Sequence, residues 1–145
     1  MSKFRLWDIV RFSIVALIVL SPPVFAQRTG DPSKGIPNYN PATEVTVTGT
    51  VEEVKQHPNP GGAGLDVHVI FKTDEETLEV HLGPPAWMAD NGFTMAKGDK
   101  LEVIGSKMQL EGRAAIVARE VTKNRMTLIF RDAKGNPLWT RTWQH

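Results

Sequence analysis

The segment LDVHVIFKTDEETLEVHLG, residues 65 to 83, constrains the fold of this chain more than any other stretch. Apolar and polar residues alternate on both sides of an acidic centre, which is typical of two half-buried strands joined by a tight turn. A turn centred on Asp74 and Glu75 predicts three apolar pairs, which are Val67 with Leu82, Val69 with Val80, and Phe71 with Leu78. A slip of one residue would turn one apolar set toward water, so this register is strongly preferred.

The same register places His68 opposite His81 on the other face of the hairpin. Directly opposed side chains have Cβ atoms about 4.5 to 5.5 Å apart, so the two imidazoles can converge on one divalent ion. The candidate metal ligands are His68, His81, Glu79 and Asp66, with Lys72 as a further ligand-binding residue on that face. Such a set suits zinc, copper or nickel, and also iron. The alternative is an ordinary exposed pair, because metal sites normally use three or four protein ligands.

Residues 1–26 have the pattern of a secretory signal peptide. The segment has a basic start that contains Lys3, Arg5 and Arg11. An apolar run then extends from Phe12 to Leu20, and small or apolar residues follow up to Ala26. The run is too short to span a bilayer, so we expect cleavage near Gln27 and a periplasmic or secreted protein without a membrane span. The alternative is an uncleaved anchor.

Export changes what the charge and composition indicate about partners. Cleavage of the signal segment would remove three positive charges and the negative charge of Asp8, which changes the formal net charge from +1 to −1. A nucleic-acid partner thereby loses its main electrostatic support. The chain has no cysteine, so its stability must come from a packed core.

The rest of the chain predicts an all-β domain. Residues 27–43 are rich in Pro, Gly and Asn and predict a disordered leader. Further strands are predicted at 44–54, 98–108 and 112–121, with a long loop at 57–64 that contains His57 and a short helix at 84–92. Five strands with one helix between the third and fourth match a five-stranded OB-fold-like Greek-key barrel over residues 44–122. Trp87, Met88, Phe93 and Met95 are expected to plug one end of the barrel.

Three runs in this region carry a family resemblance. TVTGTVEEV, DVHVIFKTDEETLEVHLGPPAW and GDKLEVIGSKMQLEGRAAIVAREV resemble the bacterial periplasmic OB-fold family linked to stress tolerance (BOF) over about residues 44 to 122. The resemblance implies a periplasmic OB-fold protein with a role in stress response. The loop at 57–64 and the tail after residue 122 have no counterpart in that family's pattern, so it is a poor guide to what they bind.

Residues 123–145 predict a C-terminal β-hairpin extension, with MTLIFRD and LWTRTW as its arms. Trp139, Arg141 and Trp143 would share one face, where a guanidinium between two indoles could receive a ligand or partner. The preferred interpretation is that Leu138 and Trp139 seal an open end of the barrel, because an isolated hairpin is marginal in water.

Three functions remain from the sequence. The leading hypothesis is an exported, non-enzymatic binding module for a small ligand or divalent metal on the face of His68, Glu79 and His81. No nucleophile elbow or phosphate-binding glycine motif supports catalysis. The second hypothesis is a periplasmic protein-interaction module that acts through the Trp-rich tail and exposed strand edges. Single-stranded nucleic-acid binding is the weakest hypothesis.

Overall fold

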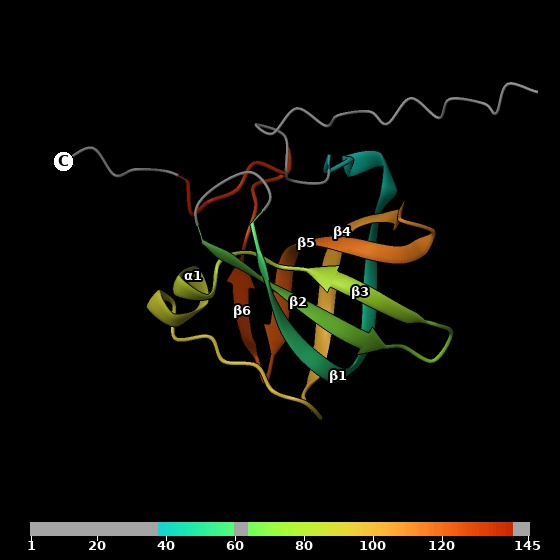
Figure 1. Ribbon diagram of the computed structural model, residues 1–145, viewed down its shortest axis with the longest axis horizontal. Coiled ribbons are helices and arrows are strands. Elements are labelled where there is room, and N and C mark those ends of the chain that lie inside the picture. The colour runs from blue at the N-terminus through green and yellow to red at the C-terminus, as the bar shows by residue number, and fades with distance from the viewer. Residues whose placement is uncertain (1–37, 60–63, 141–145) are drawn as a thin grey trace, which may run out of the picture.

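The computed structural model describes residues 38–59 and 64–140, which form a closed β-barrel with one extra strand (Figure 1). The strands are β1 (Glu44–Pro58), β2 (Leu65–Lys72), β3 (Thr77–His81), β4 (Lys100–Leu110), β5 (Arg113–Lys123) and β6 (Met126–Ile129). The sheet order is β3-β2-β1-β4-β5-β6, and parallel pairing of β3 with β5 closes the barrel. The predicted OB-fold-like barrel is confirmed, while the predicted signal peptide lies outside the described residues.

The register of the β2–β3 hairpin is the one that the sequence predicts. Val69 pairs with Val80, Phe71 with Leu78, and His68 with His81. The turn spans four residues between Lys72 and Thr77, and the Thr73 hydroxyl accepts hydrogen bonds from the backbone amides of Glu75 and Glu76. The apolar alternation therefore sets which side chains meet on the outer face.

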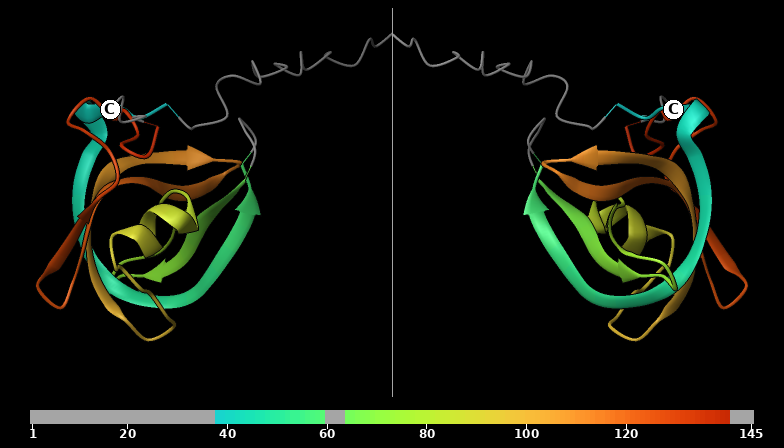
Figure 2. Two further views of the ribbon diagram at one scale, coloured as in Figure 1. Left: turned by 90° about the vertical axis from the view of Figure 1, so that its left-hand side faces the viewer. Right: turned by 90° about the vertical axis from the view of Figure 1, so that its right-hand side faces the viewer.

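Strand β1 is longer than predicted and bends round the barrel (Figure 2). Its first half pairs with β4 and its second half with β2. The bulge in β1 lies between Val51 and Glu53. Gly49 allows β1 to pass close to the end of β2, because a Cβ there would lie 2.3 Å from the carbonyl oxygen of Lys72.

The core fills the barrel with the inward residues of every strand. Phe71, Leu78, Val103 and Ile116 are almost completely buried. The short helix α1 (Pro85–Asp90) lies across one end of the barrel, as both views of Figure 2 show. The predicted plug is confirmed, because Met88 and Phe93 belong to the buried core and Trp87 and Met95 pack against it. No helix within the described residues is long and apolar enough to cross a membrane.

The C-terminal extension differs in detail from the predicted hairpin. Strand β6 pairs with β5, and the turn that follows is closed by a single bridge between Arg131 and Pro137 rather than by a second ladder. The Leu138 amide donates to the carbonyl of Phe130, and Trp139 packs against the core. Strand β6 pairs with β5 because this pairing extends an existing sheet, whereas an isolated two-stranded hairpin is only marginally stable in water.

The segment before β1 is attached to the barrel by a polar group that we call the Arg119 cluster (Tyr39, Glu44 and Arg119). Arg119 donates from Nε and Nη2 to the two carboxylate oxygens of Glu44, each at 2.8 Å, and the Tyr39 hydroxyl donates to Glu44. The short 3₁₀ helix η2 (Pro41–Thr43) lies between Tyr39 and Glu44. This two-point contact fixes the start of β1 on β5.

Candidate metal-binding site

The hairpin register brings His68, His81 and Glu79 together on the outer face of β2 and β3. The two imidazole rings lie with centroids 3.9 Å apart. Nδ1 of His68 lies 2.9 Å from Oε1 of Glu79, and Nε2 of His81 lies 3.6 Å from the same oxygen. The side chains of the two histidines are only 16% and 17% exposed, so they are held by their surroundings. The predicted meeting of His68 and His81 is confirmed.

His57 joins this group from β1, which the sequence did not predict. The chain stays in β1 through Pro58, and His57 pairs with Asp66 instead of lying in a loop. Its ring centroid lies 4.7 Å from that of His68, although the residue itself is exposed. His57, His68 and Glu79 each place one ligand atom within 4.8 Å of the others. With His81 these residues form what we call the histidine cluster (His57, His68, Glu79 and His81).

The bulge in β1 explains why His57 reaches this face. Before the bulge Val51 points into the core, and side chains alternate with a period of two. Unbroken alternation would turn His57 inward with Val51, whereas one extra residue shifts it to the face of His68. No pattern in the sequence marks the position of this bulge.

The electrostatics of the cluster keep His81 neutral and Glu79 charged. Burial lowers the pKa of His81 to about 4, and the nearby charges of His68 and Arg131 add to the effect. Burial alone would raise the pKa of Glu79, but the hydrogen bond from His68 and the charges of His81 and His68 lower it. A neutral imidazole and an ionised carboxylate are the forms that bind metals.

Asp66, the fourth predicted ligand, lies on the same face but outside the three-ligand group. Burial raises its pKa, while the charges of His68 and Arg131 oppose that shift. Arg131 is only 3% exposed and donates from Nη1 to the carbonyls of Leu82 and Ala118. Burial lowers the pKa of Arg131 to about 10, so the guanidinium stays charged at neutral pH beside Asp66.

The histidine cluster lines an open cleft with a volume of about 400 Å³. The end of β1 contributes His57 and Pro58, and the β4–β5 turn contributes Leu110, Glu111 and Arg113. In OB-folds, the face of the second and third strands and the loops after the first and fourth strands form the usual ligand surface. The cleft therefore lies where this barrel type binds its ligands.

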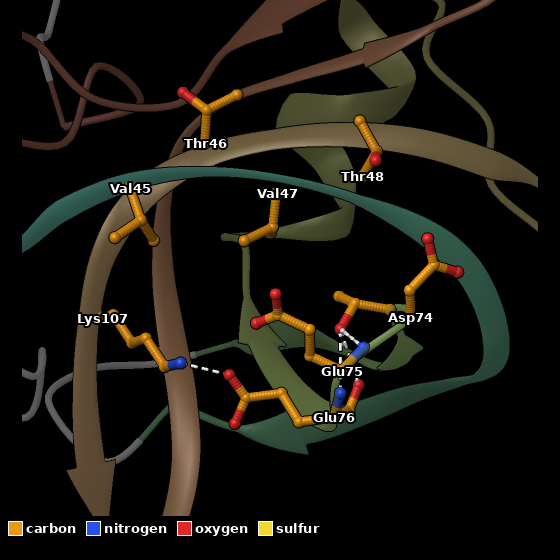
Figure 3. A pocket seen from close by; sticks show the side chains of 9 residues that line it. Val45, Thr46, Val47, Thr48, Asp74, Glu75, Glu76 and Lys107 are labelled. Atoms are coloured by element: carbon orange, nitrogen blue, oxygen red, sulfur yellow. Dashed lines mark hydrogen bonds and ion pairs between the residues drawn. The ribbon is translucent and has the colours of Figure 1, made fainter.

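A second hollow, of about 350 Å³, lies between β1 and the tip of the β2–β3 hairpin. Figure 3 shows Val47 pointing into it while Thr46 and Thr48 point away, and Lys107 reaches across to Glu76. Because Glu76 already has a lysine partner, this hollow offers a weaker set of metal ligands than the histidine cluster.

The other predicted ligand-binding residues that the structure describes, Lys72 and Trp139, do not lie together. Lys72 is exposed at the hairpin end of β2, opposite Thr77, and does not line the cleft. Trp139 packs over Gly83. The centroid of its ring lies 5.0 Å from the guanidinium carbon of Arg131, so the two side chains form a cation–π pair. Arg141 and Trp143 lie outside the described residues. The preferred sequence interpretation, in which Trp139 packs against the barrel, is confirmed.

Fold and site together define an OB-fold-like barrel that presents imidazole and carboxylate groups on the outer face of β2 and β3. The profile of the MamS/MamX magnetosome protein family matches residues 43–128, which is more than half of the chain and includes all five barrel strands. The protein belongs to this family. Among curated proteins, none matches its sequence.

The family match corrects the resemblance to the BOF stress-tolerance family. That resemblance depended on strand runs such as GDKLEVIG, in which glycine and aspartate form turns and apolar residues alternate. Such residues recur wherever a small barrel needs tight turns and an inward apolar face. They indicated the fold correctly but did not distinguish one OB-fold family from another.

Proposed function

We propose that this protein is a non-enzymatic OB-fold module that binds a divalent transition metal at the histidine cluster. The observation that carries the proposal is the convergence of donors from three strands, with ligand atoms of His57, His68 and Glu79 within 4.8 Å of one another. In a tetrahedral site with bonds of 2.0 to 2.1 Å, donor atoms are roughly 3.3 Å apart, so small side-chain rotations would complete the geometry.

The chemistry of the donors favours some metals over others. Imidazole suits zinc, copper, nickel and iron, whereas a site for magnesium or calcium would be built of oxygen ligands. Two histidines with one carboxylate also form the ligand set of non-haem Fe(II) sites. Glu79 would act either as a direct ligand or as the hydrogen-bond partner that fixes the tautomer of His68.

The protein's setting forms part of the proposal. The family consists of magnetosome proteins, and we propose that this chain acts at the magnetosome after export. The three-part pattern of residues 1–26 supports export. Interaction through the Trp-rich tail is less well supported, because Trp139 is already packed against Gly83 and Arg131. A formal charge of −1 after export also disfavours nucleic acid as the ligand.

Calorimetric titration of Zn²⁺, Cu²⁺, Ni²⁺ and Fe²⁺ into the purified protein tests the proposal. We expect one site per chain for at least one of these metals. The double substitution His68→Ala/His81→Ala should weaken it by about a hundredfold or more, since it removes two imidazole donors.

His145→Ala is the matched control, because it removes a histidine that is not one of the four cluster residues. Far-UV circular dichroism confirms that each variant is folded. Equal affinities for wild type and the double variant would eliminate the site.

A further inference from the structure

We propose that the histidine cluster binds its metal together with a small dicarboxylate, which the guanidinium of Arg113 recognises. This inference rests on the metal site proposed above and names the class of ligand that would complete it. It follows from the one-sided arrangement of the donors, the size of the cleft and the position of Arg113.

The protein donors approach the ion from one side only. His57, His68 and Glu79 project from neighbouring strands on the same face of one sheet. A transition metal takes four to six ligands arranged all round it, so coordination positions remain on the side away from the sheet. Those positions face the cleft, where an external ligand can reach them.

The cleft is large enough for such a ligand. Its volume of about 400 Å³ lies within the range of roughly 300 to 1,000 Å³ that is typical of small-molecule sites. A metal ion with one or two waters would fill a small part of it, since a water takes about 30 Å³. The space therefore fits an organic ligand beside the ion.

Arg113 is placed on the far wall of the cleft by a rigid turn. Leu110 pairs directly with Arg113, and the two residues between them have positive φ angles of 49° and 77°, as in a type I′ hairpin turn. Arg113 lies two positions before Ala115, the β3-pairing partner of Glu79, so the alternation of β5 turns its side chain toward the same face as Glu79.

The guanidinium of Arg113 is available for an anion. No carboxylate of the described residues forms an ion pair with it, although Glu111 lines the same cleft. A divalent ion offsets the carboxylates of Glu79 and Glu111, and Arg113 then gives the cleft a net positive charge. One carboxylate of a small dicarboxylate would bind the metal, and the other would fit the planar fork of Arg113.

Malonate binding to the zinc-loaded protein tests this inference. We measure it by calorimetry on the full chain, at malonate concentrations where metal analysis shows that zinc stays bound. Malonate should bind the zinc-loaded protein at least about tenfold more tightly than the metal-free protein, and acetate should bind much more weakly. Arg113→Gln should weaken malonate binding about fivefold to tenfold without weakening zinc binding.

Arg125→Gln is the matched control, because Arg125 lies in the β5–β6 turn beyond the other end of β5 and should have no effect. A short poly-glutamate peptide distinguishes a free dicarboxylate from acidic side chains of a protein. Tight peptide binding without malonate binding would overturn the inference, as would equal malonate affinity in wild type and Arg113→Gln. Failure of zinc to bind at all would overturn the metal site as well, so the two failures are distinguishable.

Discussion

The histidine cluster and the Arg119 cluster use similar polar groups in opposite ways. In the Arg119 cluster every charge has its complement, because the fork of Arg119 meets both oxygens of Glu44 and the Tyr39 hydroxyl donates to the same carboxylate. In the histidine cluster a carboxylate is surrounded by imidazoles, and its ion-pair partners among the described residues are two histidines. The Arg119 cluster therefore contains a complete ion pair, whereas the histidine cluster brings together nitrogen and oxygen atoms that can donate lone pairs to a metal.

This difference separates a structural role from the binding role that we propose. The Arg119 cluster joins the segment before β1 to β5, and it needs nothing from outside to be satisfied. The histidine cluster lies on an open cleft, and the depressed pKa of His81 keeps its imidazole neutral, so that it does not supply the missing positive charge. A divalent ion would supply it. Substitutions should therefore affect stability in one cluster and metal affinity in the other.

The largest effect in this comparison should come from Arg119→Met. Removal of the guanidinium leaves the carboxylates of Glu44 and Glu120 without their arginine partner, which should lower the free energy of unfolding by about 1–3 kcal/mol. Urea denaturation measures this change, and calorimetry should show an unchanged zinc affinity. Loss of zinc binding in a folded Arg119→Met protein would break the proposed separation.

Lys55→Met is the control for that experiment. Lys55 forms a more exposed ion pair with Glu53 at 3.4 Å, and such pairs contribute about 0 to 1 kcal/mol. A loss of stability as large as that of Arg119→Met would mean that the bidentate geometry of Arg119 has no special role.

The next largest effect should be a loss of stability at acid pH that depends on the Arg119 cluster. The hydrogen bonds from Arg119 and Tyr39 lower the pKa of Glu44 from 4.5 to about 2. As the pH falls, the unfolded chain takes up this proton near its ordinary pKa, while the folded chain resists until about 2. The contribution of Glu44 to stability is thus present above pH 4.5 and is lost as the pH approaches 2.

Unfolding free energies of wild type and Glu44→Gln, measured from pH 6 to pH 2.5, test this effect. Their difference should shrink steadily toward the acid end. The lowered pKa of His81 also reduces stability between pH 6.5 and 4, but it does so in both proteins and cancels in the difference. Parallel curves would contradict the assigned role of Glu44.

The smallest effect should come from His57→Ala. His57 is the exposed member of the cluster and contacts the other members through His68, so its loss should weaken zinc binding by about threefold to tenfold, well below the loss for His68→Ala/His81→Ala. Stability should not change, because an exposed ring contributes little packing. A loss as large as that of the double variant would show that His57 is a principal ligand and would sharpen the assignment of roles within the cluster.

The sequence predicted the part of the site that depends on alternation and missed the part that depends on an irregularity. His68 and His81 could be paired because Val69 and Phe71 must face Val80 and Leu78 in the core. His57 could not be placed, because a one-residue bulge decides which face it occupies. The alternating pattern likewise gave the barrel strands but not their family, since the residues that build turns and core are shared among small barrels.

The same limit applies to long-range contacts. Asp66 was assigned to the correct face, but nothing in the sequence places Arg131 beside it, because Arg131 arrives from the turn after β6. The inward packing of Trp139 was predictable because an isolated hairpin is marginal in water. Its specific contacts with Gly83 and Arg131 were not.

Anomalous X-ray scattering from crystals of the zinc-loaded protein tests the central claim most directly. We predict one strong peak on the outer face of β2 and β3, with donor atoms of the histidine cluster about 2.0–2.2 Å from the ion. The ligands should include His68 and at least one of His57, Glu79 and His81. A peak at the hairpin tip near Glu76 or at the C-terminal histidine, or no peak under saturating zinc, would contradict the account.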